Sequence, residues 1–258
     1  MSSPTQSHVS STLPCLDYTP LQAEFQPVVD EVSHAVARIV GDNLDSLYLY
    51  GSVAKGMAKV GVSDVDICLI TTHPLSAAQN EQLATLCENT AARHFSVSKI
   101  DIDCGTREQV LATQNHYSWG YWIKHHCRCI QGEDLAQHFQ PFAPSRDIAL
   151  AVNGDYHGVL QGYLLRLQET ASEHHLRRLQ KEASRKLIRA TNILRPASST
   201  YWPATLAEHV SFAAQHSPGS VEFLPFFLLQ AHTPTAPIPE FCERLQQALQ
   251  WMQQQGDY

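Results

Sequence analysis

Residues 47–70 read LYLYGSVAKGMAKVGVSDVDICLI and hold two apolar runs joined by a glycine-containing connection. The first run ends at Gly51 and Ser52, and the second is preceded by Asp64 and contains Asp66. Side chains alternate between the two faces of a strand, so both carboxylates share one face, about 7 Å apart along the backbone. We therefore predict two strands, over 46–50 and 65–71, with a loop between them and a pair of carboxylates where the second strand begins.

Paired carboxylates on one strand face repel each other unless a cation or a proton lies between them. Mg²⁺ is the cation that this pairing favours, because it prefers oxygen ligands and usually takes one or two carboxylates together with substrate phosphates. The glycine after the first strand allows the backbone to approach a phosphate closely. The Ser52 hydroxyl and nearby backbone N–H groups are suitable donors to phosphate oxygens. The stretch thus predicts a site where a metal and a phosphate meet.

A second acidic strand is predicted over residues 97–104, VSKIDIDC. Asp101 and Asp103 share one face of it, and the isoleucines share the other. If this strand lies beside the first, a third carboxylate joins the site. Three carboxylates, two metal ions and a triphosphate form a site for nucleotidyl transfer. Asp101 is the preferred third carboxylate because it lies deeper in the strand, and Asp103, nearer the end, is the alternative.

The order Gly51-Ser52, a further glycine, Asp64-x-Asp66 on a strand and a later acidic residue on another strand resembles the signature of the polymerase-β-type nucleotidyltransferases. The motif spans the region from Tyr48 to Asp103. The layout of the whole chain is most similar to the small aminoglycoside adenylyltransferases and related small nucleotidyltransferases.

The resemblance implies a Mg²⁺-dependent enzyme that transfers a nucleoside monophosphate, AMP from ATP in first place, to a hydroxyl of a small molecule and releases pyrophosphate. By this resemblance, two Mg²⁺ ions are held by Asp64, Asp66 and Asp101. Gly51 and Ser52 orient the β- and γ-phosphates, and Asp101 is the nearest candidate for the base that deprotonates the acceptor. The implied acceptor is an aminoglycoside, and the implied role is antibiotic resistance.

Two other functions remain open at this point. The first is nucleotidyl transfer to a protein or an RNA, as in antitoxin-type relatives, which are usually shorter chains. The second is a nucleotide-binding regulator that has lost catalysis. All three carboxylate positions are filled in this sequence, which argues against the second function.

The second half of the chain has a different pattern from the first. A proline-containing break at 140–147, QPFAPSRD, separates alternating strand and helix patterns from a run of helical periodicity. We expect a loose leader over 1–19, a nucleotidyltransferase domain with a small mixed sheet over 20–143, and an all-α helical bundle over 144–258. The predicted helices are 21–41, 76–94, 106–114, 147–171, 172–195, 203–215, 221–230 and 239–254.

The predicted helix 172–195 holds seven of the chain's 18 Lys and Arg residues. Lys181 and Arg185 belong to a basic stripe opposite an apolar one. Such a stripe is typical of the solvated face of a bundle helix, and it equally suits contact with a triphosphate, with Lys181 and Arg185 on the phosphates. Lys55, in the glycine-containing loop, presents the same two alternatives of phosphate contact and solvation.

Composition narrows the class of protein further. With 258 residues, of which 43% are hydrophobic, the chain suffices for one or two domains. A net charge of −7 argues against a general nucleic-acid-binding surface and suits a neutral or cationic acceptor. Seven cysteines, several inside apolar runs, indicate reduced, buried thiols and a cytoplasmic location. No apolar run approaches the roughly 20 residues of a membrane span, so the expected partners are an NTP and a small molecule, without a membrane.

Overall fold

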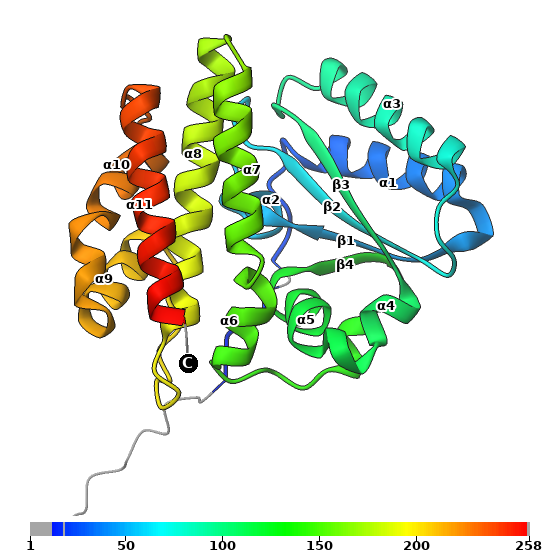
Figure 1. The fold of residues 1–258 in the computed structure, drawn as a ribbon. Coiled ribbons are helices and arrows are strands. Elements are labelled where there is room, and N and C mark those ends of the chain that lie inside the picture. The colour runs from blue at the N-terminus through cyan, green and yellow to red at the C-terminus, as the bar shows by residue number, and fades with distance from the viewer. Residues whose placement is uncertain (1–11, 18, 257–258) are drawn as a thin grey trace, which may run out of the picture. The chain divides into compact units, whose positions relative to one another are not determined.

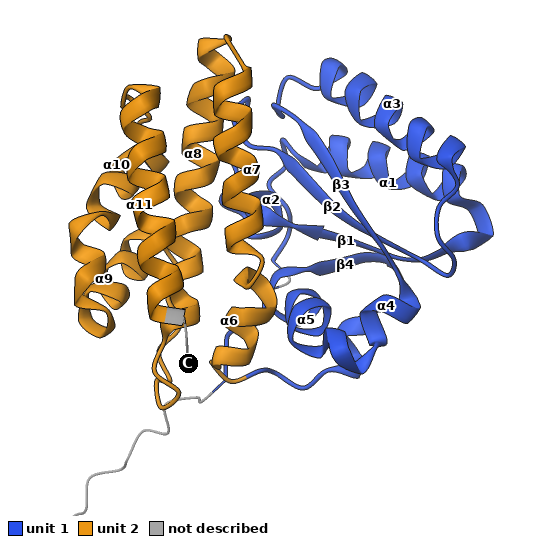
Figure 2. Ribbon diagram, in the orientation of Figure 1, with its two compact units in different colours: residues 1–142 blue, residues 143–258 orange. Residues whose placement is uncertain are grey.

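The computed structural model of the chain describes residues 12–17 and 19–256 (Figure 1). The chain divides into two compact units, Met1–Phe142 and Ala143–Tyr258 (Figure 2). The first unit combines strands and helices, whereas the described residues of the second form helices and no strand. This confirms the predicted fold class, an α/β part followed by an all-α part.

Unit 1 is built on a four-stranded mixed sheet with the strand order β3-β2-β1-β4 (Figure 1). β1 is antiparallel to both β2 and β4, and β2 is parallel to β3. The three strands predicted from the sequence are confirmed, with bounds that differ by up to three residues, and β4 completes the sheet. The strands are β1 (Leu44–Tyr50), β2 (Val65–Thr71), β3 (Ile100–Thr106) and β4 (Arg128–Gly132).

The helices of unit 1 differ from the prediction at one place near the site. Residues after Tyr50 were expected to be a loop, but α2 forms a single helical turn directly after β1, and Gly51 at its start has φ +75°. A turn this short has no periodicity that a sequence pattern could reveal. The helices are α1 (Gln26–Val40), η1 (Gly41–Asn43), α2 (Gly51–Ala54), α3 (Ala77–Arg93), α4 (Arg107–Leu111), η2 (Thr113–Asn115), the π-helical η3 (His116–Gly120), α5 (Tyr121–His126) and η4 (Leu135–His138).

The core of unit 1 lies between α1 and one face of the sheet. Val28 and Val32 of α1 are fully buried and belong to the same cluster as Leu47 and Leu49 of β1 and Ile67 of β2. Each such side chain contributes about 1.5–3 kcal/mol when it leaves water. Because strand side chains alternate, burying this face directs the polar residues of β2 and β3 to the opposite face.

Most of the expected loose leader lies outside the described residues, but residues 12–17 are described and are anchored. Leu13 is buried, and its N–H donates to the carbonyl of Phe142 at 2.7 Å. The ring of His125 lies between these two segments. Its Nε2 accepts the N–H of Phe142 at 2.9 Å, so its Nδ1 carries the proton and donates to the carbonyl of Pro14 at 2.9 Å. His125 therefore holds these two chain segments together.

This arrangement predicts a pH-dependent stability. Burial lowers the pKa of His125 below its usual 6.5. Because the unfolded chain then binds the proton more tightly than the folded one, the neutral ring contributes its full stability above pH 6.5 and loses it as the pH falls further. We expect the free energy of unfolding, measured by urea titration, to decrease between pH 7.5 and pH 5. The decrease should be smaller in His125→Gln, and an equal decrease in both proteins would contradict the assignment.

Unit 2 consists of helices, and the expected single helix over 147–171 is wrong. α6 ends at Asn153 and α7 begins at Tyr156. A Cβ at Gly154 would lie 2.6 Å from the carbonyl oxygen of Leu150, so the chain leaves α6 at a position that only glycine fits. The helices are α6 (Arg146–Asn153), α7 (Tyr156–Glu169), α8 (Glu173–Ala190), η5 (Thr191–Leu194), α9 (Leu206–His216), η6 (Pro218–Glu222), α10 (Leu224–His232) and α11 (Ile238–Gly256).

Helix α8 has the amphipathic character that the sequence predicts. Leu179, Ala183 and Leu187 of its apolar stripe are fully buried in the core of unit 2. Lys181 and Arg185, on the basic stripe, are half-buried. Within the part of the chain that the structure describes, no helix has both the length and the apolar character needed to cross a membrane.

Candidate active site

The pairing of β2 with β3 brings the predicted acidic residues together in unit 1. Asp66 lies opposite Asp101, and Cys68 lies opposite Asp103. Residues that pair across two parallel strands have side chains on the same face of the sheet. Asp64 precedes Asp66 by two residues, which is one period of the side-chain alternation, so it shares that face. Asp64, Asp66 and Asp101 therefore lie on the face away from the α1 core, and we refer to these three residues as the carboxylate site.

The electrostatics of the carboxylate site centre on Asp66. Burial, followed by the charges of Asp64, Asp101 and Asp103 in that order of effect, raises its pKa to about 6. Among the described residues, none donates a hydrogen bond to the Asp66 carboxylate or forms an ion pair with it. An oxygen-only donor set with an excess of negative charge suits a hard divalent cation such as Mg²⁺.

The neighbouring carboxylates each have a partner within the protein. Oδ1 of Asp64 accepts a hydrogen bond from Ser98 Oγ at 2.5 Å. Oδ1 of Asp101 forms an ion pair with Lys99 Nζ at 2.5 Å. With these side chains so placed, no three His, Cys, Asp or Glu side chains of the described residues already form a cation site.

Gly51 touches the carboxylate site through its backbone. A Cβ at this position would lie 2.0 Å from Oδ2 of Asp66, and φ is +75°. Glycine is therefore required both by the backbone conformation and by the space that Asp66 occupies. Ser52 follows within α2 and is half-buried, and Lys55 follows α2 with an exposed side chain.

Three aromatic residues beside the site were not assigned to it from the sequence. The Tyr50 hydroxyl donates to Oδ2 of Asp103 at 2.5 Å, and burial, followed by this hydrogen bond, raises the pKa of Tyr50, so the phenol stays protonated. The rings of Tyr50 and Trp122 pack edge to face with their centroids 5.0 Å apart, and the centroids of Trp122 and Trp119 are 5.3 Å apart. The alternation of β1 could have placed Tyr50 on the carboxylate face, but the tryptophans are brought there by the tertiary fold.

Two further sequence candidates belong to the second unit. Lys181 and Arg185 belong to α8 of unit 2.

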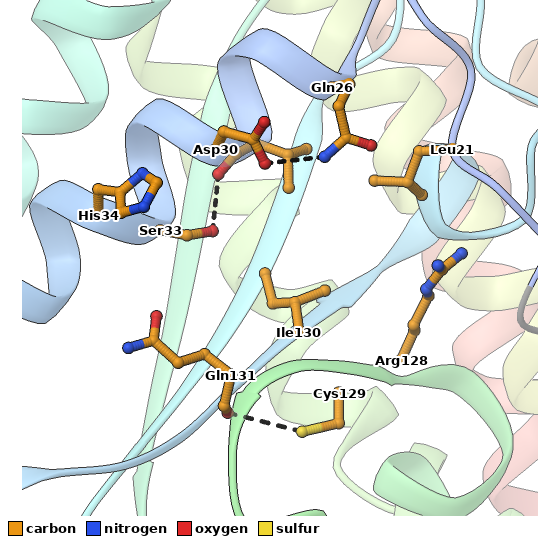
Figure 3. Close-up of a pocket in the computed structure, with 10 residues that line it drawn as sticks. Leu21, Gln26, Asp30, Ser33, His34, Arg128, Cys129, Ile130 and Gln131 are labelled. Carbon is orange, nitrogen blue, oxygen red and sulfur yellow. Dashed lines mark hydrogen bonds between the residues drawn. The ribbon is translucent and has the colours of Figure 1, made fainter.

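A hollow of about 490 Å³ opens in unit 1 between α1 and β4 (Figure 3), and it is lined by Gln26, Asp30 and Arg128 among others. Its lining contains none of the proposed site residues. This hollow is therefore separate from the carboxylate site.

The thiols are more varied in exposure than the sequence suggests. All seven cysteines are free, and Cys68 and Cys127 are buried as expected. Cys15 and Cys104 are exposed, which corrects the expectation of buried thiols for these two.

Comparison with known proteins agrees with this geometry. Residues 29–111 match the family model of the nucleotidyltransferase domain, a range that contains Gly51 and the whole carboxylate site. This part of unit 1 is therefore similar to a nucleotidyltransferase domain. No curated protein matches the chain in sequence.

Solved structures extend the similarity to most of the chain. The crystal structure of spectinomycin adenyltransferase from Enterococcus faecialis with ATP and spectinomycin superposes with a TM-score of 0.57. Sequence identity is 12%, and the match covers 87% of this chain and 99% of the other. At this identity the match shows only that the two chains share a fold.

Proposed function

We propose that this protein is a Mg²⁺-dependent nucleotidyltransferase that moves AMP from ATP, or a nucleoside monophosphate from another NTP, to a hydroxyl of a small molecule. The observation that carries the proposal is the pairing of Asp66 with Asp101 across β2 and β3, with Gly51 in contact with Asp66. This constellation lies inside the region that matches the nucleotidyltransferase domain. We propose a cationic acceptor such as an aminoglycoside, because the chain carries a net charge of −7 and its fold resembles that of an adenyltransferase solved with spectinomycin.

The residues of unit 1 divide the work of the reaction. Asp64, Asp66 and Asp101 would hold two Mg²⁺ ions, which neutralise the triphosphate and the leaving pyrophosphate. Backbone N–H groups at Gly51 and the Ser52 hydroxyl would donate to the β- and γ-phosphates. The acceptor oxygen bonds to the α-phosphorus as the bond to the pyrophosphate oxygen breaks. Asp101 is the candidate that takes the acceptor proton.

The third carboxylate is proposed to be Asp101 rather than Asp103. Asp101 lies directly opposite Asp66, and its charge raises the pKa of Asp66 more than that of Asp103 does. Asp103 lies opposite Cys68 and accepts the Tyr50 hydroxyl instead. Asp103 remains the alternative if substitution of Asp101 leaves catalysis intact.

Lys55, Lys181 and Arg185 are proposed as further phosphate contacts on the basis of their charge. Replacing Lys181 and Arg185 together by Ala should raise the Kd for ATP by about tenfold or more, as expected for losing hydrogen bonds from charged donors. Lys186→Ala is the matched control, because it removes a charge from the same helix where Lys186 pairs with Asp155. Isothermal titration measures the Kd, and an unchanged value in the double variant would remove both residues from the nucleotide site.

The acceptor class is tested by pyrophosphate release from ATP and Mg²⁺ across a panel of aminoglycosides. We expect release to depend on one class of acceptor and to be accompanied by an adenylylated product detectable by mass spectrometry. Tight ATP binding with no turnover on any of these acceptors would contradict a small cationic acceptor. In that case, transfer to a protein or an RNA, or a regulatory role, would become the leading function.

A further inference from the structure

Two adjacent residues before β3 hold the outer members of the carboxylate site. Ser98 donates its hydroxyl to Oδ1 of Asp64, and Lys99 places its ammonium on Oδ1 of Asp101, each at 2.5 Å. Asp66, between them, has no such partner among the described residues. The two contacts differ in kind, because one is a neutral donor and the other is a full positive charge.

The backbone fixes where these two residues lie. Ser98 N–H donates to the carbonyl of Ser63 at 3.1 Å, and Val65 N–H donates to the carbonyl of Lys99 at 2.9 Å. The carbonyl oxygen of Val62 lies 2.9 Å from the same Ser98 Oγ, so it shares the single hydroxyl proton with Asp64. These bonds extend the pairing of β2 and β3 toward the start of both strands. Ser98 and Lys99 therefore stay beside the carboxylates even when their side chains change partners.

We propose that Ser98 and Lys99 are positioning residues with opposite effects on cation binding. The Ser98 hydroxyl occupies one oxygen of Asp64 and leaves the other available, so it orients this carboxylate for a cation. The Lys99 ammonium occupies Asp101 with a positive charge that repels a second cation, so cation binding is an exchange in which Lys99 leaves Asp101. This inference rests on the proposed function of the carboxylate site.

The exchange is feasible because the ion pair is exposed. The side chains of Lys99 and Asp101 keep 58% and 39% of their surface accessible, so water screens the pair and the lysine has room to move away. Exposed pairs of this kind change a binding constant by about two- to fivefold. The lysine also neutralises part of the repulsion within the carboxylate site while no cation is bound, since its charge lowers the pKa of Asp66.

The test is Mn²⁺ binding to the nucleotide-free protein, followed by electron paramagnetic resonance of the unbound ion. We expect Lys99→Met to lower the Kd for Mn²⁺ by about two- to fivefold and Ser98→Ala to raise it by a similar factor. Lys99→Arg keeps the ion pair and should bind Mn²⁺ as the wild type does. Lys59→Met is the matched control, because it removes an exposed charge from the preceding loop.

The outcomes separate the inference from the function on which it rests. If the wild type binds Mn²⁺, two results would overturn the exchange. One is a Kd for Mn²⁺ that is unchanged or higher in Lys99→Met. The other is a Kd that falls equally in Lys99→Met and in Lys59→Met. Absence of Mn²⁺ binding in every variant would overturn the carboxylate site itself, and the exchange with it. A melting temperature near that of the wild type shows that a variant is folded. If Lys99→Met does not fold, Lys99→Gln is used in its place.

Discussion

Replacing Asp66 by Asn should lower the rate of pyrophosphate release by at least about a hundredfold, a loss typical of removing one group that stabilises transition-state charge. Asp66 lies opposite Asp101 and in contact with Gly51, so its carboxylate is the centre of the proposed cation site. The amide has nearly the same shape and lacks the charge. Continuous pyrophosphate assays of both proteins at saturating ATP and acceptor measure the change.

The same substitution should leave the fold intact. Burial and the neighbouring acidic residues raise the pKa of Asp66 to about 6, so the ionised carboxylate at pH 7.5 is less stable in the folded protein than in the unfolded chain. We therefore expect the melting temperature of Asp66→Asn to equal or exceed that of the wild type. Asp42→Asn, at an exposed position in η1, is the control with unchanged activity. Full activity in Asp66→Asn would rule out the proposed centre, and unfolding would rule out the electrostatic argument.

The second large effect is expected for Gly51→Ala. The new Cβ would lie 2.0 Å from Oδ2 of Asp66, so the carboxylate would have to turn out of its position. The left-handed backbone, with φ +75°, adds about 1–2 kcal/mol for a residue with a side chain. We expect a lower melting temperature together with loss of pyrophosphate release, whereas the Asp66 variant should show the loss of activity alone.

Gly41→Ala separates the two causes. Gly41 has φ +60°, and a Cβ there would meet nothing within 4 Å, so this variant carries the backbone cost without the overlap. It should be destabilised to a smaller extent and keep its activity. If Gly51→Ala is as active as Gly41→Ala, Asp66 does not need the position that the structure gives it.

The strands near the site were predictable because their pattern is set by one buried face. β2 begins and ends at the predicted residues, and the alternation of Asp64, Val65 and Asp66 predicted which side chains leave the core. The sequence predicted that Asp101 would lie near Asp66 only if the two acidic strands were neighbours. The structure shows that β2 and β3 are paired. The register of β2 and β3 gives the physical reason for preferring Asp101 to Asp103. No local sequence pattern specifies that register.

Other features depend on contacts that the sequence does not encode locally. Ser98, Lys99 and Tyr50 reach the acidic residues through side-chain conformations and strand pairing. In these cases tertiary geometry decides, and the residue types alone are compatible with several arrangements.

Transfer of label from ATP tests the central claim most directly. The protein, Mg²⁺ and a panel of hydroxyl acceptors are incubated with ATP labelled either at the α-phosphorus or at the γ-phosphorus. Nucleotidyl transfer predicts that the α-label appears on an acceptor while the γ-label leaves as pyrophosphate, and that both signals vanish in Asp66→Asn. Transfer of the γ-label to an acceptor, or release of free phosphate without α-label transfer, would contradict the assignment of this site to nucleotidyl transfer.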